Sequence, residues 1–289
     1  MIIEGLYCEC GGEGGAVYPL NHYRTGECKR PPMPVPMIES ILSNIVNDTR
    51  HAGGNITVTR LLTCPREIAI HDNLPVVFDV RKHFSLHAGT MLHGALEEAA
   101  PLGVYAEVLV PPIGTERPTV GGEPYSGRAD FVHADFGAIE DYKWHSEGAQ
   151  KWKSSKMEVN EVNDDAVQLN LLRIGVARTV LQVPDAEYLP RLTVWHLAMT
   201  SARGPSAAIE MPAPIMDEAA ILAFNPKDGD STVAEAIGDY RSFRAARARG
   251  VAAEDAIREM PLRGRAMMKG QKCLLYCGMR TVCDRLAGV

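Results

Sequence analysis

Hydrophobic and polar residues alternate in several short stretches in the middle of the chain, a pattern typical of β-strands. The first stretch, VYAEVLV, ends at a pair of prolines, and the next two are separated by Asp135-Phe136-Gly137, which predicts a hairpin turn. The predicted strands are VYAEVLV (104–110), PYSGRADFVHAD (124–135), GAIEDYKWH (137–145), RLTVWHLAMT (191–200) and SAAIEM (206–211).

Helical spacing of apolar residues is found on both sides of these strands and between them. The predicted helices are MIESILSNIV (37–46), TVTRLLTCPREIAI (57–70), HAGTMLHGALEEAA (87–100), DDAVQLNLLRIGVARTVL (164–181) and most of the chain after residue 230. Pro65 is expected to bend or restart the second helix. The central order of helix, three strands, helix and strand predicts an α/β fold, a mixed sheet flanked by helices.

The strand AIEDYKW (138–144) carries more charge than an interior strand usually tolerates. An unpaired buried charge costs several kcal/mol, so these side chains need partners. Residues two apart in a strand share a face, which predicts that Asp141 and Lys143 face one side of the sheet and Glu140 the other. The predicted hairpin brings Asp130 close to Asp141.

Two interpretations of this strand remain open. In the first, Asp130 and Asp141 hold Mg²⁺ or Mn²⁺, which prefer oxygen ligands, and Lys143 orients a water or stabilises charge on a phosphate. In the second, Lys143 forms a half-buried salt bridge with Asp130 or Asp141.

Composition narrows the class of protein. The chain has 289 residues, 46% of them hydrophobic, and a formal net charge of −6, which suits one large domain or a core domain with appendages. Residues 241–289 contain eleven Lys and Arg against four Asp and Glu, so a local +7 stands beside −13 in the rest. Such a tail can bind a polyanion, or it can be a solvated helical face with no binding role. With neither a signal-peptide pattern nor a long apolar run, we expect a cytoplasmic protein with no membrane partner.

The seven cysteines fall into three groups, and in a reducing compartment they indicate metal binding rather than disulfides. Cys8, Cys10 and Cys28 lack a fourth thiol, which His22 could replace to give a Cys₃His zinc site. These residues lie in a Cys-rich segment, 1–36, that ends in the linker-like RPPMPVP. The alternative is a flexible segment with free thiols. Cys64 stands alone, and the third group is Cys273, Cys277 and Cys283.

Five motifs together resemble the PD-(D/E)XK nuclease superfamily, and most of all its RecB-like branch, which includes the CRISPR-adaptation exonucleases. In chain order they are VTRLLTCPRE, GTMLHGALEEA with Gly89 and His93, GRADF, IEDYKW and AVQLNLLRI. The resemblance runs from about Thr57 to Cys283. It implies a restriction-endonuclease-like sheet flanked by helices and a nuclease domain over residues 37–289.

The resemblance also assigns roles to single residues. Asp130 and Asp141 match the metal-binding acids, His93 matches a further ligand to Mg²⁺ or Mn²⁺, and Lys143 matches the catalytic lysine. Gln168 matches the glutamine that helps to position the lysine and the substrate. Glu140 has no place in the pattern, and Glu107 is considered as an acid that supports the site. This chain departs from the family at Ala129, where proline is common, and at Leu172, where tyrosine is common.

In the iron–sulfur nucleases of this branch, one cysteine before the core and three after it bind a 4Fe–4S cluster. Cys64 with Cys273, Cys277 and Cys283 has that layout, which implies an iron–sulfur cluster in a helical C-terminal region. The spacing C-x3-C-x5-C differs from the usual first gap of two, and structural zinc is the competing ligand of four thiolates.

The activity implied is a Mg/Mn-dependent deoxyribonuclease, an exonuclease on single-stranded DNA ends with 5′→3′ as the predicted direction. Recombination, repair, CRISPR adaptation and phage DNA processing are the settings it suggests, with recombination or CRISPR-adaptation proteins as partners and a homo-oligomer compatible with the family. One alternative is a non-catalytic subunit that binds DNA ends. Another is a redox sensor, which leaves the Asp and Lys residues unexplained.

Overall fold

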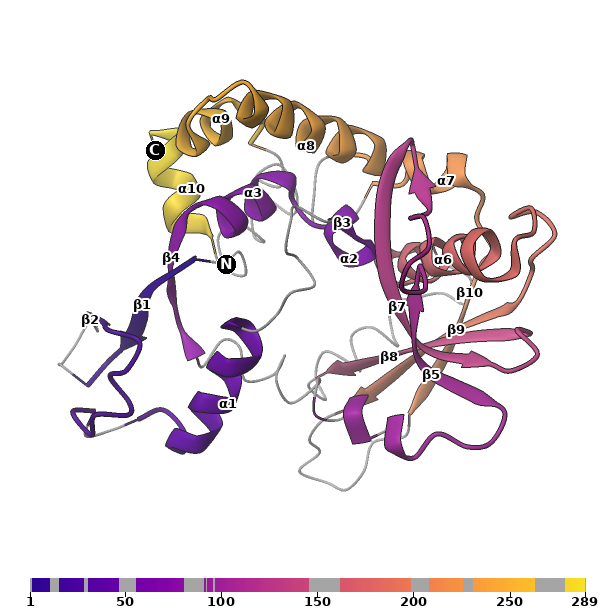
Figure 1. Cartoon of the computed structure of the whole chain (residues 1–289), viewed down its shortest axis with the longest axis horizontal. Coiled ribbons are helices and arrows are strands. Elements are labelled where there is room, and N and C mark those ends of the chain that lie inside the picture. The colour runs from indigo at the N-terminus through magenta and orange to yellow at the C-terminus, as the bar shows by residue number, and fades with distance from the viewer. Residues whose placement is uncertain are drawn as a thin grey trace. The chain divides into compact units, whose positions relative to one another are not determined.

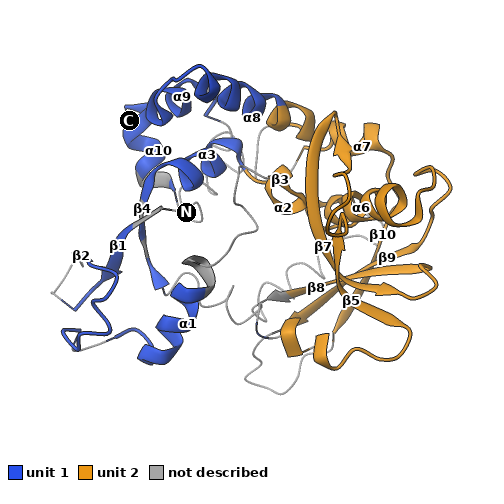
Figure 2. Ribbon diagram, in the orientation of Figure 1, with its two compact units in different colours: residues 1–55, 64–91, 238–289 blue, residues 56–63, 92–237 orange. Residues whose placement is uncertain are grey.

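The chain forms two compact units in the computed structural model (Figure 2). Unit 1 comprises residues 1–55, 64–91 and 238–289, and unit 2 comprises residues 56–63 and 92–237. The structure describes residues 2–10, 16–28, 31–46, 56–80, 91, 93–95, 97–145, 162–198, 208–225, 231–262 and 279–288.

Unit 2 is built on a seven-stranded mixed sheet (Figure 1). Strands β10-β9-β8-β7-β3 lie in that order, and β5 and β6 also pair with β7. The hairpin of β7 and β8 is antiparallel, whereas β8 and β9 are parallel, so the predicted mixed α/β sheet is confirmed. The strands are β3 (Ile56–Thr57), β5 (Val104–Val110), β6 (Thr119–Val120), β7 (Glu123–His133), β8 (Ala138–His145), β9 (Arg191–Ala198) and β10 (Ile209–Ala213).

Helix α6 (Asp164–Val176) connects the parallel strands β8 and β9 and packs on the sheet. It begins at Asn163, whose side chain accepts a hydrogen bond from Ala166 N at 2.9 Å, and a π-helical turn, η2 (Ala177–Leu181), follows it. Gly175 lets the helix approach β5 closely, because a Cβ at this position would lie 2.0 Å from Val110 Cγ1. The helix thereby holds Gln168 over the strands that carry the candidate site.

Unit 1 contains a second sheet, of three strands in the order β2-β1-β4. Strand β1 (Ile2–Cys8) pairs antiparallel with β2 (Ala16–Tyr18) and parallel with β4 (Pro75–Phe78), a connection that the sequence did not predict. Helix α1 (Val35–Val46) includes residue 36, the predicted end of the Cys-rich segment. The boundary between that segment and a nuclease domain stays a prediction. The buried core here includes Leu6, Tyr23, Ile38, Ile41 and Val80.

The helices around Cys64 follow the predicted interruption at Pro65. Helix α2 (Val58–Leu61), in unit 2, ends before Cys64, and α3 (Pro65–Asn73), in unit 1, begins directly after it. Two further helices of unit 1, α9 (Ala253–Glu259) and α10 (Arg280–Ala287), pack with α3 (Figure 1). The Arg66 guanidinium donates to Met260 O at 2.9 Å, which ties α3 to the end of α9.

Two further helices are α7 (Glu218–Ala223) and α8 (Val233–Ala248), and residues 93–95 and 97–98 are also helical. Among the described residues, none of the helices combines the length and the apolar character that crossing a membrane requires.

Candidate metal and catalytic site

Asp141 and Lys143 lie on one face of β8, as the alternation predicts. The Lys143 ammonium is 2.7 Å from Asp141 Oδ2, and the Asp141 side chain is almost completely buried. The register of β7 and β8 places Asp130 opposite Asp141, because Phe131 pairs with Glu140 and the next positions along the two antiparallel strands are Asp130 and Asp141. The Asp130 carboxylate accepts a hydrogen bond from Tyr142 N at 2.7 Å, which fixes it at the junction of β7 and β8.

Three potential metal ligands converge next to the ion pair of Asp141 and Lys143. One ligand atom from each of His93, Glu107 and Asp130 lies within 4.8 Å of the others. His93 Nδ1 is 3.4 Å from Asp130 Oδ1 and 3.7 Å from Glu107 Oε1. Hydrogen bonds to Asp130 and Glu107 raise the pKa of His93 to about 10, against the opposing effect of burial. The sequence predicted a metal site of His93, Asp130 and Asp141. In the structure, the side chain that joins His93 and Asp130 is Glu107, and Asp141 pairs with Lys143.

Glu107 adopts an unusual backbone conformation. Its φ is 53°, in the left-handed region that non-glycine residues rarely enter. The neighbouring pairs Ala106–Phe131 and Val108–Ala129 place Glu107 opposite Asp130 between β5 and β7. Arg128 Nη1 donates to Glu107 Oε2 at 2.7 Å and helps to hold the carboxylate. Burial alone would raise the pKa of Glu107, but hydrogen bonds with His93 and Arg128 lower it below its ordinary value.

The charge on Lys143 is set by the acids around it. Burial by itself would lower the pKa of the Lys143 ammonium, but the Asp141 and Asp165 carboxylates outweigh burial and raise that pKa above its ordinary value. Burial raises the pKa of Asp141 to about 6, although the nearby ammonium opposes this rise. Lys143 is therefore a cation at neutral pH in this arrangement.

Gln168 lies beside the lysine, on the helix that covers the sheet. Lys143 Nζ donates to Gln168 Oε1 at 3.2 Å. The amide and the Asp141 carboxylate thus hold the ammonium from two elements, α6 and β8. A contact of this kind can orient the lysine, the role that the resemblance assigns to Gln168.

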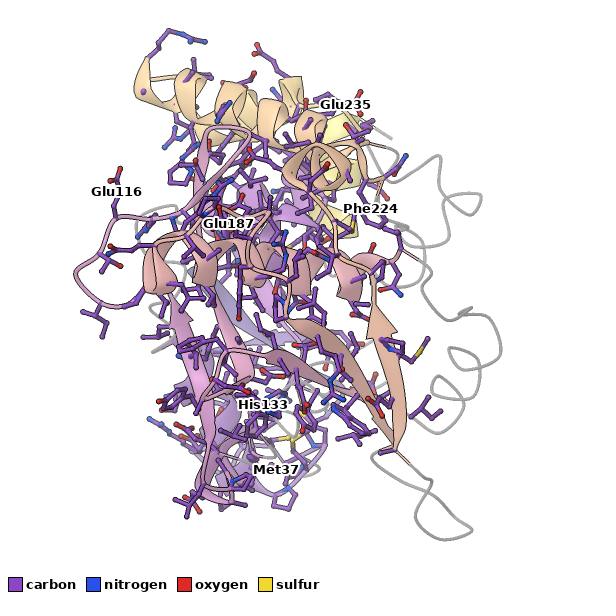
Figure 3. The ribbon with its side chains drawn as sticks, turned by 90° about the vertical axis from the view of Figure 1, so that its right-hand side faces the viewer. Met37, Glu116, His133, Glu187, Phe224 and Glu235 are labelled. Atoms are coloured by element: carbon purple, nitrogen blue, oxygen red, sulfur yellow. The ribbon has the colours of Figure 1, made fainter. Side chains whose placement is uncertain are left out.

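Glu140 lies on the opposite face of β8 and has its own set of partners there. Its carboxylate accepts hydrogen bonds from Trp195 Nε1 at 3.1 Å and from the Tyr142 hydroxyl at 3.2 Å. His133, labelled in Figure 3, and Arg191 contact the other oxygen at 3.2 and 3.3 Å. The predicted separation of Glu140 from Asp141 and Lys143 is confirmed, and these contacts satisfy its buried charge.

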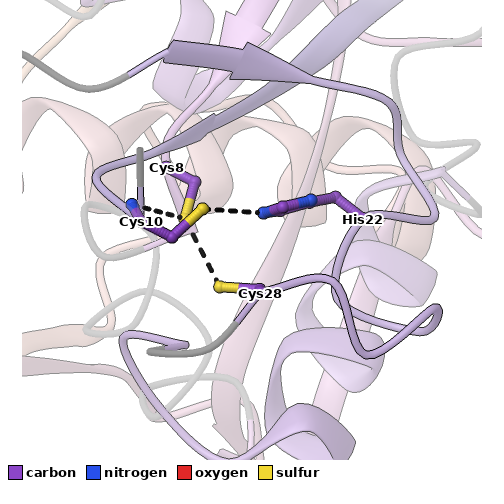
Figure 4. A group of neighbouring side chains, drawn as sticks. All are labelled: Cys8, Cys10, His22 and Cys28. Atoms are coloured by element: carbon purple, nitrogen blue, oxygen red, sulfur yellow. Dashed lines mark hydrogen bonds between the residues drawn. The ribbon is translucent and has the colours of Figure 1, made fainter. Parts of the chain in front are cut away.

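A second group of potential metal ligands lies in unit 1 (Figure 4). One ligand atom each from Cys8, Cys10, His22 and Cys28 lies within 4.8 Å of the others, so these side chains could bind a metal. Burial alone would raise the pKa of the Cys8 thiol, but a hydrogen bond from the Cys10 backbone, with others from neighbouring side chains, lowers it to about 7. A lowered thiol pKa favours the thiolate, the form that binds metals.

The C-terminal cysteines are only partly described. Cys64 directly precedes α3, and Cys283 lies on α10, a helix that packs against α3. Cys273 and Cys277 lie outside the described residues. Both described cysteines are of intermediate exposure.

Comparison with protein-family models and with curated proteins finds no match. Among solved structures, "Crystal structure of SSO0001" is similar at 15% sequence identity with a TM-score of 0.45, over 86% of this chain and 93% of that chain. A likeness of this extent does not identify a family.

Proposed function

We propose that this chain is a metal-dependent deoxyribonuclease that hydrolyses phosphodiester bonds, with single-stranded DNA ends as substrate. The observation that carries the proposal is the convergence of His93, Glu107 and Asp130 beside the ion pair of Lys143 and Asp141. This arrangement supports the function that the PD-(D/E)XK resemblance implies, with the restriction-endonuclease-like sheet as its scaffold.

The donor set fits Mg²⁺ or Mn²⁺. Carboxylate oxygens from β5 and β7 are joined by one imidazole, and Mn²⁺ accepts both donor types. His93, Glu107 and Asp130 would hold the ion, with Asp141 as the further carboxylate that the resemblance assigns. Once bound, the ion lowers the pKa of a coordinated water and neutralises phosphate charge.

The lysine then has an electrostatic role in the proposed reaction. Because its pKa lies above the ordinary value, Lys143 is a poor general base and a good stabiliser of negative charge. Its ammonium is held at a defined position by Asp141 and Gln168, so it need not reorganise when charge develops on the phosphate.

Two further cofactors belong to the proposal. The packing of α3 against α10 supports a 4Fe–4S cluster at Cys64, Cys283 and the undescribed Cys273 and Cys277. The N-terminal group of three thiols and an imidazole is suited to Zn²⁺.

The test is digestion of single-stranded DNA labelled at the 5′ or the 3′ end, with Mn²⁺ and purified full-length protein. We expect short products that require the metal, and the labelled end that is released first gives the direction of degradation. The Lys143→Ala protein, checked for folding, serves as the control for a contaminating nuclease. If the protein binds DNA but leaves it intact with each metal tested and with either labelled end, the result would favour the non-catalytic end-binding subunit and contradict the proposal.

A further inference from the structure

The four side chains of the N-terminal group come from three places in unit 1. Cys8 ends β1, Cys10 follows two residues later, His22 lies in the turn after β2, and Cys28 lies beyond that turn (Figure 4). Convergence of such distant residues is what a metal centre needs, because the ligands must enclose one point.

Two of the distances between the donor atoms lie close to, and slightly below, the edges of a tetrahedron around zinc. Zinc–sulfur bonds of about 2.3 Å and zinc–nitrogen bonds of about 2.0 Å give edges of about 3.8 Å between sulfurs and about 3.5 Å between sulfur and nitrogen. In the structure, Cys8 Sγ is 3.5 Å from Cys28 Sγ, and Cys10 Sγ is 3.2 Å from His22 Nε2. A disulfide would need about 2.05 Å between the two sulfurs.

The burial of this group argues against a simple apolar core. His22 is 2% exposed, and its Nδ1 lacks a hydrogen-bond partner among the described residues, whereas Nε2 faces a sulfur. Three thiols gathered around a buried imidazole nitrogen form a donor set that zinc binds. Tyr18 stacks on the ring at 4.0 Å between centroids and fixes its plane.

We propose that Cys8, Cys10, His22 and Cys28 form a closed structural zinc centre that ties the turn after β2, residues 19–28, to the end of β1. Thiolate and imidazole donors select zinc over Mg²⁺ or Mn²⁺, and four protein ligands leave no position for a substrate. The centre therefore has no part in phosphodiester hydrolysis. This inference rests on the zinc assignment proposed above and is independent of nuclease activity.

Glu27 is the positioning residue of this centre. Its Oε2 lies 3.9 Å from His22 Nδ1, on the side of the ring away from the thiols. When Nε2 binds the metal, Nδ1 carries the proton, and the Glu27 carboxylate accepts its hydrogen bond once the two atoms move closer than the present 3.9 Å. Such a contact fixes the tautomer and the orientation of the ligand, and its loss usually weakens metal binding about 10- to 100-fold.

The first experiment is X-ray absorption at the zinc edge of the purified full-length protein, with zinc and iron measured on the same sample. We expect about one zinc per chain, with three sulfur neighbours at about 2.3 Å and one nitrogen at about 2.0 Å. A four-sulfur shell would place zinc at the C-terminal cysteines and overturn the assignment. So would a shell of oxygen and nitrogen, or iron at the N-terminal group.

Variants then test which residues hold the ion. Cys10→Ser is expected to lose most of the zinc, whereas Cys64→Ser keeps it. Glu27→Gln keeps all four proposed ligands, and we expect it to lose zinc to a competing chelator about 10- to 100-fold more readily than the wild type does. Glu9→Gln makes an equal charge change nearby and is expected to keep zinc as the wild type does. Zinc that survives Cys10→Ser, or equal behaviour of the two glutamine variants, would overturn the centre or the role of Glu27, respectively.

Discussion

The ammonium of Lys143 lies 2.7 Å from the Asp141 carboxylate, while Glu140, the residue before Asp141, points to the other face of the same strand. Adjacent acids in one strand thus have unlike surroundings. Asp141 is joined to the candidate site, and Glu140 is bound by Trp195 and Tyr142. The strand separates charge used for the proposed chemistry from charge used for packing.

The first prediction follows from this separation. Asp141→Asn or Lys143→Ala should reduce the rate of DNA cleavage by a factor of about 100 or more, because each removes a charge at the proposed reaction centre. Glu140→Gln should leave the rate per folded molecule close to that of the wild type. The rates are measured with end-labelled single-stranded DNA and Mn²⁺ after circular dichroism has confirmed folding. If Glu140→Gln were the only variant to lose cleavage, the catalytic face of β8 would be the one that carries Glu140, and the present assignment would be wrong.

The second prediction concerns Glu107 and uses its left-handed backbone. Both Glu107→Gly and Glu107→Ala should weaken Mn²⁺ binding, because both remove a carboxylate from the group with His93 and Asp130. The glycine variant should be the more stable of the two by about 1 kcal/mol, because only glycine adopts a φ of 53° without strain. Calorimetric titration with Mn²⁺ and urea unfolding measure the two effects separately. Unchanged Mn²⁺ affinity in both variants would remove Glu107 from the ligands.

The part of the site that local pattern predicts is the part carried by the β7–β8 hairpin. Alternation in a single strand gives the faces of Asp141, Lys143 and Glu140, and a short turn fixes where Asp130 lies. The four N-terminal metal ligands were likewise grouped by residue type, and the structure brings them together. The metal they hold stays a proposal.

The proximity of Glu107 to Asp130 depends on a longer connection. Between β5 and β7 the chain makes an excursion through β6, so no short turn sets their register, and the left-handed φ has no marker such as glycine in VYAEVLV. The parallel pairing of β1 with β4 was missed for the same reason, since the two strands are separated by helices α1 to α3. Contacts between distant segments are fixed by packing rather than by local pattern.

The third prediction tests the proposed iron–sulfur cluster. Cys64→Ser and Cys283→Ser should each lose most of the iron, because a cluster of this kind needs its four thiolates. Cys8→Ser should retain iron and lose zinc, which makes it the matched cysteine control. Iron, acid-labile sulfide and zinc are measured on protein purified without oxygen. Wild-type protein without iron that holds about two zinc ions per chain, one of which is lost in Cys64→Ser, would show that the competing zinc assignment is right.

The fourth prediction concerns the acid sensitivity of unit 2. Burial alone would raise the pKa of Glu218, but hydrogen bonds from Arg178 and Gly121 N lower it below its ordinary value of 4.5. A lowered folded-state pKa gives stability that is present above the ordinary pKa and is lost as the pH falls towards the folded-state value. Glu218→Gln should therefore lose less stability than the wild type across this range. Urea unfolding between about pH 6 and about pH 3 measures the two slopes, and equal slopes would contradict the prediction.

The last prediction tests the close approach of α6 to the sheet. A Cβ at Gly175 would lie 2.0 Å from Val110 Cγ1, and Val110 is 1% exposed, so its side chain has little room to move. Gly175→Ala should lower the free energy of unfolding by about 1–3 kcal/mol. It should also reduce cleavage, because the helix that it displaces carries the Gln168 contact to Lys143.

Gly238 provides the control, since it also lies in a helix but a Cβ there would meet nothing within 4 Å. Gly238→Ala should raise the free energy of unfolding by up to about 1 kcal/mol through helix propensity alone. Chemical unfolding of both variants measures the difference, which is expected to have opposite signs at the two glycines. If Gly175→Ala were as stable as Gly238→Ala, the contact between α6 and β5 would be looser than described, and the position of Gln168 would not depend on it.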